Sequence, residues 1–200
     1  MQFDITLHKE FNKTIIDYGI VKGNETIIFI KTGQNGSIYG YNNKYLNIAK
    51  SLNNKYGYTI ICSSNPFEGN NPLDNAMEVI ENYCYKNNII DYKIYYMGHS
   101  NGGIIGIWYG VNYPKIKRML LINTPLTYNF HKTKEGINKF KGESLIMVYG
   151  DQDQSYKYTE LLSSLKTSNF KIKIIKNQDH HFSKNDLDFK NLPEKYLINI

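Results

Sequence analysis

The stretch YYMGHSNGG, residues 95–103, decides how this chain is expected to fold. It begins as an apolar run, turns at Gly-His-Ser-Asn-Gly, and continues into the apolar segment IIGIWYGV, residues 104–111. A chain that passes this abruptly from a strand into a helix leaves no room for side chains two positions before and after the apex, where glycine stands here. The pattern therefore predicts a strand, a strained turn that exposes the hydroxyl of Ser100, and a buried helix.

Strand-like and helix-like segments alternate on both sides of this turn. Short apolar or β-branched runs predict strands at residues 2–8, 14–21, 26–31, 58–62, 93–97, 119–122, 145–149 and 171–176. Apolar residues at helical spacing predict helices at residues 45–52, 73–86, 101–113 and 156–165, and a last helix around Lys195. The first two strands are expected to pair as an opening hairpin or meander. The regular alternation of the others predicts one α/β domain over residues 1–200, with a mostly parallel twisted sheet and helices on both faces.

Composition limits the classes of protein to which this chain can belong. It has 200 residues, 41% of them hydrophobic, and no run approaches the roughly 20 apolar residues of a membrane helix. Residues 1–10 lack a signal-peptide core, so a cytoplasmic location and reduced, core-facing thiols at Cys62 and Cys84 are expected. The net charge of +6 comes from basic residues spread along the chain, which indicates a solvated surface and neither a nucleic-acid nor a membrane partner.

Two later strand ends carry the residue types that would make a serine hydroxyl reactive. A neutral hydroxyl needs a base that removes its proton, and the base needs a carboxylate that orients it. The strand expected at 145–149 is followed by Gly-Asp-Gln-Asp, and the strand at 171–176 by Asn-Gln-Asp-His-His-Phe. Because parallel strands bring their carboxyl ends to one edge of a sheet, both motifs are expected to meet Ser100 there.

Each of these motifs offers two candidates. Spacing alone leaves Asp151 or Asp153 as the acid and His180 or His181 as the base. As alternatives, either aspartate fits a turn or a helix cap, and His181 fits a surface histidine. His99 precedes the serine and is expected to face away from it and to support the turn.

The chain order serine, aspartate, histidine makes residues 25–185 resemble the α/β-hydrolase superfamily. In that family the acid commonly ends a G-x-x-D segment and the base stands in a D-H-x-F context, which favours Asp153 and His180 as partners of Ser100. The resemblance implies the α/β-hydrolase fold and a Ser-His-Asp triad.

The resemblance also implies an oxyanion hole, in which two backbone N–H groups stabilise the charge that develops on a carbonyl oxygen. Asn101 N–H directly follows the serine. The second donor comes from the loop after the third strand, here Lys-Thr-Gly-Gln-Asn-Gly at residues 31–36, and Gln34 N–H is the prediction. Thr32 stands where the family usually has histidine, which leaves the local hydrogen bonding open. The alternative is a glycine loop shaped only by packing.

The leading hypothesis is a serine hydrolase that cleaves a small carboxylic ester through an acyl-enzyme. A thioesterase or acyltransferase needs the same residues, and a non-catalytic binding protein with this fold is the alternative outside the enzymes. Only residues 124–142 occupy the place where family members often insert a cap, so no cap domain and an open site are expected. Without a metal-ligand cluster or phosphate-binding loop in the sequence, we expect a small acyl substrate and neither cofactor nor metal.

Overall fold

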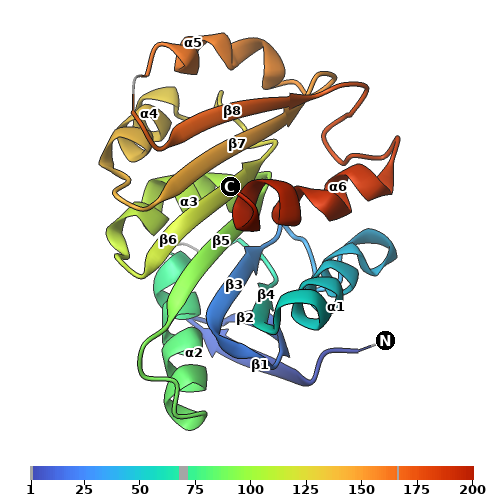
Figure 1. Cartoon of the computed structure of the whole chain (residues 1–200), viewed down its shortest axis with the longest axis vertical. Helices are drawn as coiled ribbons and strands as arrows, with labels where there is room; N and C mark the ends of the chain where they lie inside the picture. Colours follow the sequence, from blue (N-terminus) through green and yellow to red (C-terminus); the bar gives the residue numbers. More distant parts are fainter. Residues whose placement is uncertain (1, 68–71, 166) are drawn as a thin grey trace.

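A computed structural model describes residues 2–67, 72–165 and 167–200, and in this part of the chain eight strands form one sheet (Figure 1). The strands are β1 (Ile5–Phe11), β2 (Thr14–Val21), β3 (Asn24–Lys31), β4 (Tyr58–Ser63), β5 (Lys93–His99), β6 (Ile116–Ile122), β7 (Ser144–Gly150) and β8 (Phe170–Ile175). Their order across the sheet is β1-β2-β4-β3-β5-β6-β7-β8. The pairs β1–β2 and β2–β4 are antiparallel and the others are parallel. The predicted mostly parallel sheet and its opening hairpin are therefore confirmed.

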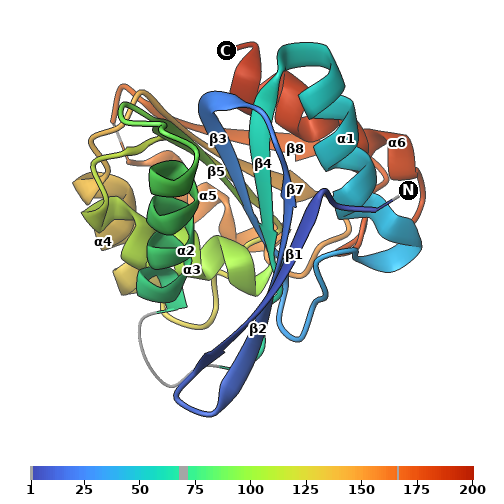
Figure 2. The same cartoon turned by 90° about the horizontal axis from the view of Figure 1, so that it is seen from below.

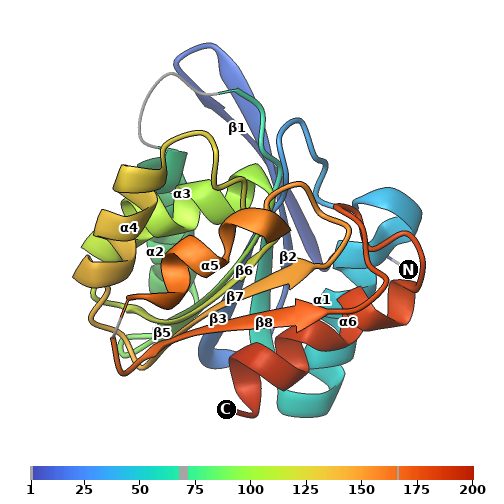
Figure 3. The same ribbon diagram turned by 90° about the horizontal axis from the view of Figure 1, so that it is seen from above.

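Helices cover both faces of the sheet (Figures 2 and 3). They are α1 (Lys44–Tyr56), α2 (Pro72–Lys86), α3 (Asn101–Tyr109), α4 (Phe130–Lys139), α5 (Glu160–Ser163) and α6 (Asp186–Pro193). Helices α1 and α6 pack on one face, and α2, α3, α4 and α5 contribute to the core on the other. Each layer alone would leave an apolar face in water, so the two cores require all three layers.

The two cores follow from the alternation of side chains along the strands. In β3, Phe29 faces the side of α2 and α3, whereas Ile28 and Ile30 face the side of α1 and α6, and all three are fully buried. Burial of each such side chain stabilises the fold by about 1.5–3 kcal/mol. Cys62 and Cys84 are free and buried on opposite faces of the sheet, in agreement with the expectation of core-facing thiols.

Some predicted boundaries are wrong at the ends of helices. Helix α3 was expected to reach residue 113, but it ends at Tyr109 and a 3-10 turn follows from Gly110 to Asn112. Glycine is a poor helix former, and Tyr113 is extended because it precedes Pro114. The segment expected as a helix at 156–165 is a 3-10 turn at Tyr156–Tyr158 followed by the single turn of α5.

The chain end is helical, as predicted around Lys195. Helix α6 begins after Asn185, whose side chain accepts a hydrogen bond from Leu187 N–H at 3.1 Å and so caps the helix. It continues through Pro193 into one wider turn at Glu194–Ile198. In the part of the chain that the structure describes, no helix has both the length and the apolar character needed to span a membrane.

The carboxyl ends of the parallel strands lie at one edge of the sheet, where β5 turns into α3 (Figure 3). Along the chain, helix α4 follows β6 and precedes β7, within the 124–142 segment in which the family often places a cap. Because the carboxyl ends of the parallel strands lie here, the loops after β3, β5, β7 and β8 also lie at this edge. They carry the polar residues that the sequence analysis selected, among them Ser100, Asp153 and His180.

Candidate active site

The turn between β5 and α3 has the strained geometry that the sequence predicts. Ser100 has φ 54° and ψ −121°, a region that residues with a side chain rarely occupy, and its N–H donates to Ile122 O at 2.8 Å. A Cβ atom on Gly98 would lie 2.4 Å from Gly102 O, and one on Gly102 would lie 2.2 Å from Lys31 O. Glycine is therefore required on both sides of the serine by close contacts with backbone.

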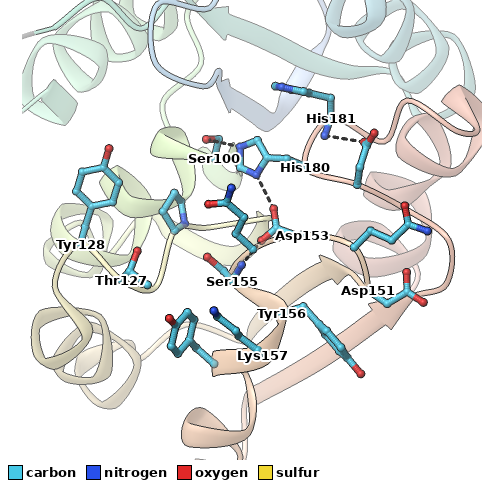
Figure 4. A pocket seen from close by; sticks show the side chains of 15 residues that line it. Ser100, Thr127, Tyr128, Asp151, Asp153, Ser155, Tyr156, Lys157, His180 and His181 are labelled. Carbon is cyan, nitrogen blue, oxygen red and sulfur yellow. Dashed lines mark hydrogen bonds and ion pairs between the residues drawn. The ribbon is translucent and has the colours of Figure 1, made fainter.

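His180 connects the serine to a buried carboxylate (Figure 4). Its Nε2 lies 2.9 Å from Ser100 Oγ, and its Nδ1 lies 2.5 Å from Asp153 Oδ2. The Asp153 side chain is 1% exposed, and its other oxygen accepts a hydrogen bond from Ser155 N–H at 2.7 Å. A carboxylate accepts only, so Nδ1 carries the proton and Nε2 is free to accept the serine proton.

The structure separates the two candidates in each motif. Among the described residues, no hydrogen bond joins Asp151 to either histidine, and Figure 4 shows the Asp151 side chain apart from Asp153. His181 is exposed, and its backbone N–H donates to Asp179 Oδ1 at 3.0 Å. Asp153 and His180, the pair favoured by the family pattern, are thus the ones brought to the serine.

His99 faces away from the serine, as expected, and holds the backbone of the histidine loop. It is buried, and its Nε2 lies 2.9 Å from His180 O while its Nδ1 lies 3.2 Å from the Tyr45 hydroxyl. A carbonyl oxygen only accepts, so Nε2 is the donor and Nδ1 accepts from Tyr45. Burial lowers the pKa of His99 to about 3, and the ring is therefore neutral near pH 7.

Asn123, at the end of β6, is a buried site residue that the sequence analysis missed. Its Nδ2 donates to Asp179 O at 3.0 Å and His180 O at 2.9 Å, and its Oδ1 accepts from Gly150 N–H at 2.9 Å. Its φ of 45° is left-handed, a conformation that asparagine tolerates better than most residues. One side chain thus ties the end of β7 to the loop after β8. A polar residue directly after the apolar run MLLI was the available signal.

A turn from Asp179 to Ser183 fixes the other side of the histidine loop. Asp179 accepts hydrogen bonds from Ser183 Oγ–H, from Ser183 N–H at 3.0 Å and from His181 N–H at 3.0 Å. The bonds from Ser183 contribute most to lowering the pKa of Asp179 to about 2. The adjacent Phe182 is fully buried against Phe189, with ring centroids 5.5 Å apart. His180 therefore projects from a loop anchored on both sides.

The loop after β3 is held by hydrogen bonds from the side chains of Thr32 and Asn65. Thr32 Oγ lies 3.0 Å from Gly36 O and 3.2 Å from Ser63 O, and its single hydrogen is shared between these two carbonyl oxygens. Asn65 Nδ2 donates to Thr32 O at 2.9 Å and to Asn101 Oδ1 at 3.0 Å, which joins this loop to the start of α3. Thr32 and Asn65 together fix the loop, and the role of Asn65 was not foreseen.

The backbone N–H groups in the loop after β3 and at the start of α3 differ in whether they have a protein acceptor. The N–H groups of Asn35 and Gly36 donate within the chain, at 2.8 Å each. Over the described ranges, no protein acceptor is found for Gln34 N–H or for Asn101 N–H. Both residues contribute to the wall of one recess of about 130 Å³.

A cleft of about 890 Å³ opens beside Ser100 and His180 (Figure 4). The rest of its wall comes from the loops after β6, β7 and β8 and is mostly polar. This volume lies in the range of small-molecule sites. Within residues 2–67, 72–165 and 167–200, no group of three or more His, Cys, Asp or Glu side chains is arranged to hold a metal ion.

No protein-family model and no curated protein matches this sequence. Solved structures do match its fold. Est1E from Butyrivibrio proteoclasticus is 14% identical with a TM-score of 0.72 over 95% of this chain and 96% of that one. A serine hydrolase without a lid from Xanthomonas campestris is 12% identical with a TM-score of 0.68 over 97% and 95% of the two chains. The thioesterase domain from the curacin biosynthetic pathway is 11% identical with a TM-score of 0.67 over 94% and 98%.

At such low identities these likenesses establish the fold. The protein has the α/β-hydrolase fold, as the serine motif and the order of the polar strand ends predicted.

Proposed function

We propose that this protein is a serine hydrolase that cleaves small carboxylic esters through an acyl-enzyme. The observation that carries the proposal is the position of the His180 imidazole, with Nε2 2.9 Å from Ser100 Oγ and Nδ1 2.5 Å from Asp153 Oδ2. Serine becomes a useful nucleophile only when a base at this distance takes its proton as it attacks. A non-catalytic role for the fold would not require this arrangement.

In the proposed reaction, Ser100 Oγ attacks the ester carbonyl carbon while its proton moves to His180 Nε2. The bond from carbon to the alcohol oxygen then breaks, and His180 returns the proton to that oxygen. A water molecule repeats the sequence on the acyl-enzyme, so that ester and water give acid and alcohol. Asp153 keeps the imidazole in the tautomer that accepts at Nε2 and stabilises its charged form.

The oxyanion of each tetrahedral intermediate would be stabilised by the N–H groups of Gln34 and Asn101. Both lack a protein acceptor over the described ranges, and Asn65 holds their two segments together through Thr32 O and Asn101 Oδ1. One such donor contributes about 2.7–4 kcal/mol to transition-state stabilisation in a related chemistry. The helix that begins at Asn101 adds its positive dipole end.

Covalent labelling tests this proposal directly. A fluorophosphonate probe should add one equivalent to the wild-type protein and none to Ser100→Ala, since the probe reacts with an activated serine hydroxyl. Ser51→Ala, at an exposed serine on α1, is the matched control and should be labelled as the wild type is. A folded wild-type protein that stays unlabelled would refute the proposal.

Thioester hydrolysis or acyl transfer uses the same residues, and one structurally similar protein is a thioesterase domain. Values of kcat/KM for matched oxygen esters and thioesters of one acyl group distinguish these reactions. We expect oxygen esters to be hydrolysed at least as fast as their thioester counterparts. A strong preference for thioesters would indicate that the protein is a thioesterase.

A further inference from the structure

Two hollows of different size adjoin the turn that carries the serine, one with Ser100 in its wall and the other with Asn101. The large cleft of about 890 Å³ includes His180 and Asp153 in its wall. The second hollow is a recess of about 130 Å³, whose wall includes Gln34 and Asn101 but neither of those two residues.

The position of the imidazole decides which part enters the large cleft. The alcohol oxygen must accept the proton from His180 Nε2 as its bond to carbon breaks, so it lies on the side of His180. The oxyanion lies toward the N–H groups of Gln34 and Asn101. The recess has Asn101, the residue after the nucleophile, in its wall, and we assign the remaining part of the ester, the acyl chain, to it.

The recess is small and mostly apolar. Side chains from α3 form one wall, and Ile104 and Ile105 are nearly fully buried there beside Trp108. Its volume of about 130 Å³ is well below the 300–1,000 Å³ of sites that hold drug-sized molecules. A short aliphatic chain fits this wall, while a long or charged one does not.

The wall of the large cleft is more polar than that of the recess. Thr127, Gln152, Gln154 and Lys157 supply hydrogen-bonding groups. Tyr156, which is 40% exposed, and Lys157 also contribute to the wall of this cleft. Many donors and acceptors together with accessible tyrosine faces suit a ligand that has several hydroxyl groups and a partly apolar ring.

We propose that the substrates are short-chain acyl esters of polyhydroxylated, sugar-like alcohols, with the acyl group in the recess and the alcohol in the cleft. This inference rests on the proposed function, because it assigns the two products of that reaction to two hollows. It predicts two separate selectivities, one for chain length and one for the alcohol.

Chain length is tested with p-nitrophenyl esters of two to ten carbons. The value of kcat/KM should peak at two to four carbons and fall by about 10-fold or more once the chain exceeds the recess. Ile104→Ala should move the peak to longer chains, and Trp108→Phe gives a milder enlargement if the first variant does not fold. Ile15→Ala, at an exposed position on β2, is the matched control and should leave the profile unchanged. A wild-type optimum at eight carbons or more would overturn the inference.

The alcohol is tested with a monoacetylated monosaccharide against cyclohexyl acetate, which share the acyl group and a six-membered ring. The sugar ester should have a kcat/KM at least about 10-fold higher, mainly through a lower KM. Tyr156→Ala should remove this preference, and Tyr85→Ala, at an exposed tyrosine on α2, should not. Equal values of kcat/KM for the two acetates would overturn this inference. If Ser100 were still labelled by the fluorophosphonate, the proposed function would remain. An unlabelled wild type would defeat the proposed function and this inference together.

Discussion

Asp153 Oδ2 lies 2.5 Å from His180 Nδ1, and the carboxylate is 1% exposed while the imidazole is 36% exposed. The acid is therefore almost completely covered, and the ring that it orients is the accessible member of the pair. Since Ser155 N–H occupies the other carboxylate oxygen at 2.7 Å, the Asp153 side chain is held by one bond from each side. This arrangement leaves little freedom for the tautomer of His180.

Replacing this carboxylate by an amide should remove most of the activity. In Asp153→Asn the amide group can donate to Nδ1, which favours the wrong tautomer, and kcat should fall by about four orders of magnitude, as in serine proteases. Asp151→Asn is the matched control, two residues away on the same loop, and should change kcat by less than about threefold. Rates with p-nitrophenyl acetate measure both, and a larger loss in Asp151→Asn would reassign the acid.

Asn123 should act as a positioning residue for His180. Asn123→Ala removes three hydrogen bonds and leaves Gly150 N–H without its acceptor, and the unfolding free energy should fall by about 1–3 kcal/mol. Because the loop loses an anchor, kcat should fall by about 10-fold or more with KM little changed, and the downfield NMR signal of the His180 Nδ1 proton should weaken.

Asn169→Ala controls for the loss of stability alone. Asn169 Nδ2 also donates to two carbonyl groups, Phe140 O at 3.3 Å and Gly142 O at 2.9 Å, outside the cleft wall. This variant should lose similar stability but keep kcat and the NMR signal. If the two variants lost activity equally, the role of Asn123 would be structural only.

The sequence allowed the fold and the three converging side chains to be predicted because both depend on local patterns. Apolar runs bounded by glycine and polar residues mark strand ends, and parallel strands bring such ends together, so Ser100, Asp153 and His180 could be found from their own neighbours. The contacts of Asn123 and Asn65 depend on which carbonyl groups distant loops present. No local pattern specifies those contacts, and the early end of α3 at Tyr109 was likewise hidden by apolar residues that continue beyond it.

Acid should weaken the folded state through His99. Burial lowers its folded-state pKa to about 3, whereas an unfolded histidine titrates near 6.5. Between these two values the unfolded chain binds one more proton, so the unfolding free energy falls as pH falls, by about 1.4 kcal/mol per unit from this group. Above about pH 6.5 the contribution is fully present.

His99→Gln removes this titration and retains a donor that can reach His180 O. Urea unfolding from pH 7 to pH 4 should therefore show a smaller acid loss for the variant than for the wild type. His8→Gln, at an exposed histidine on β1, is the control and should retain the wild-type slope. Parallel curves for His99→Gln and the wild type would show that His99 is not held neutral.

Alanine substitutions at Gly98 and Gly33, two glycines near the serine, should have different effects on stability and on activity. A Cβ on Gly98 would meet backbone at 2.4 Å, so Gly98→Ala should lower the unfolding free energy by about 3 kcal/mol or more. A Cβ on Gly33 would lie 3.3 Å from Ser100 Cβ, a contact that a shift of a few tenths of an ångström relieves. Gly33→Ala should therefore fold with a loss below about 1 kcal/mol and still lower kcat/KM by about 10-fold, because the displaced atom belongs to the nucleophile. Urea unfolding and p-nitrophenyl acetate hydrolysis of the two variants measure this difference, and a Gly33→Ala protein with full activity would show that the loop after β3 does not constrain the serine.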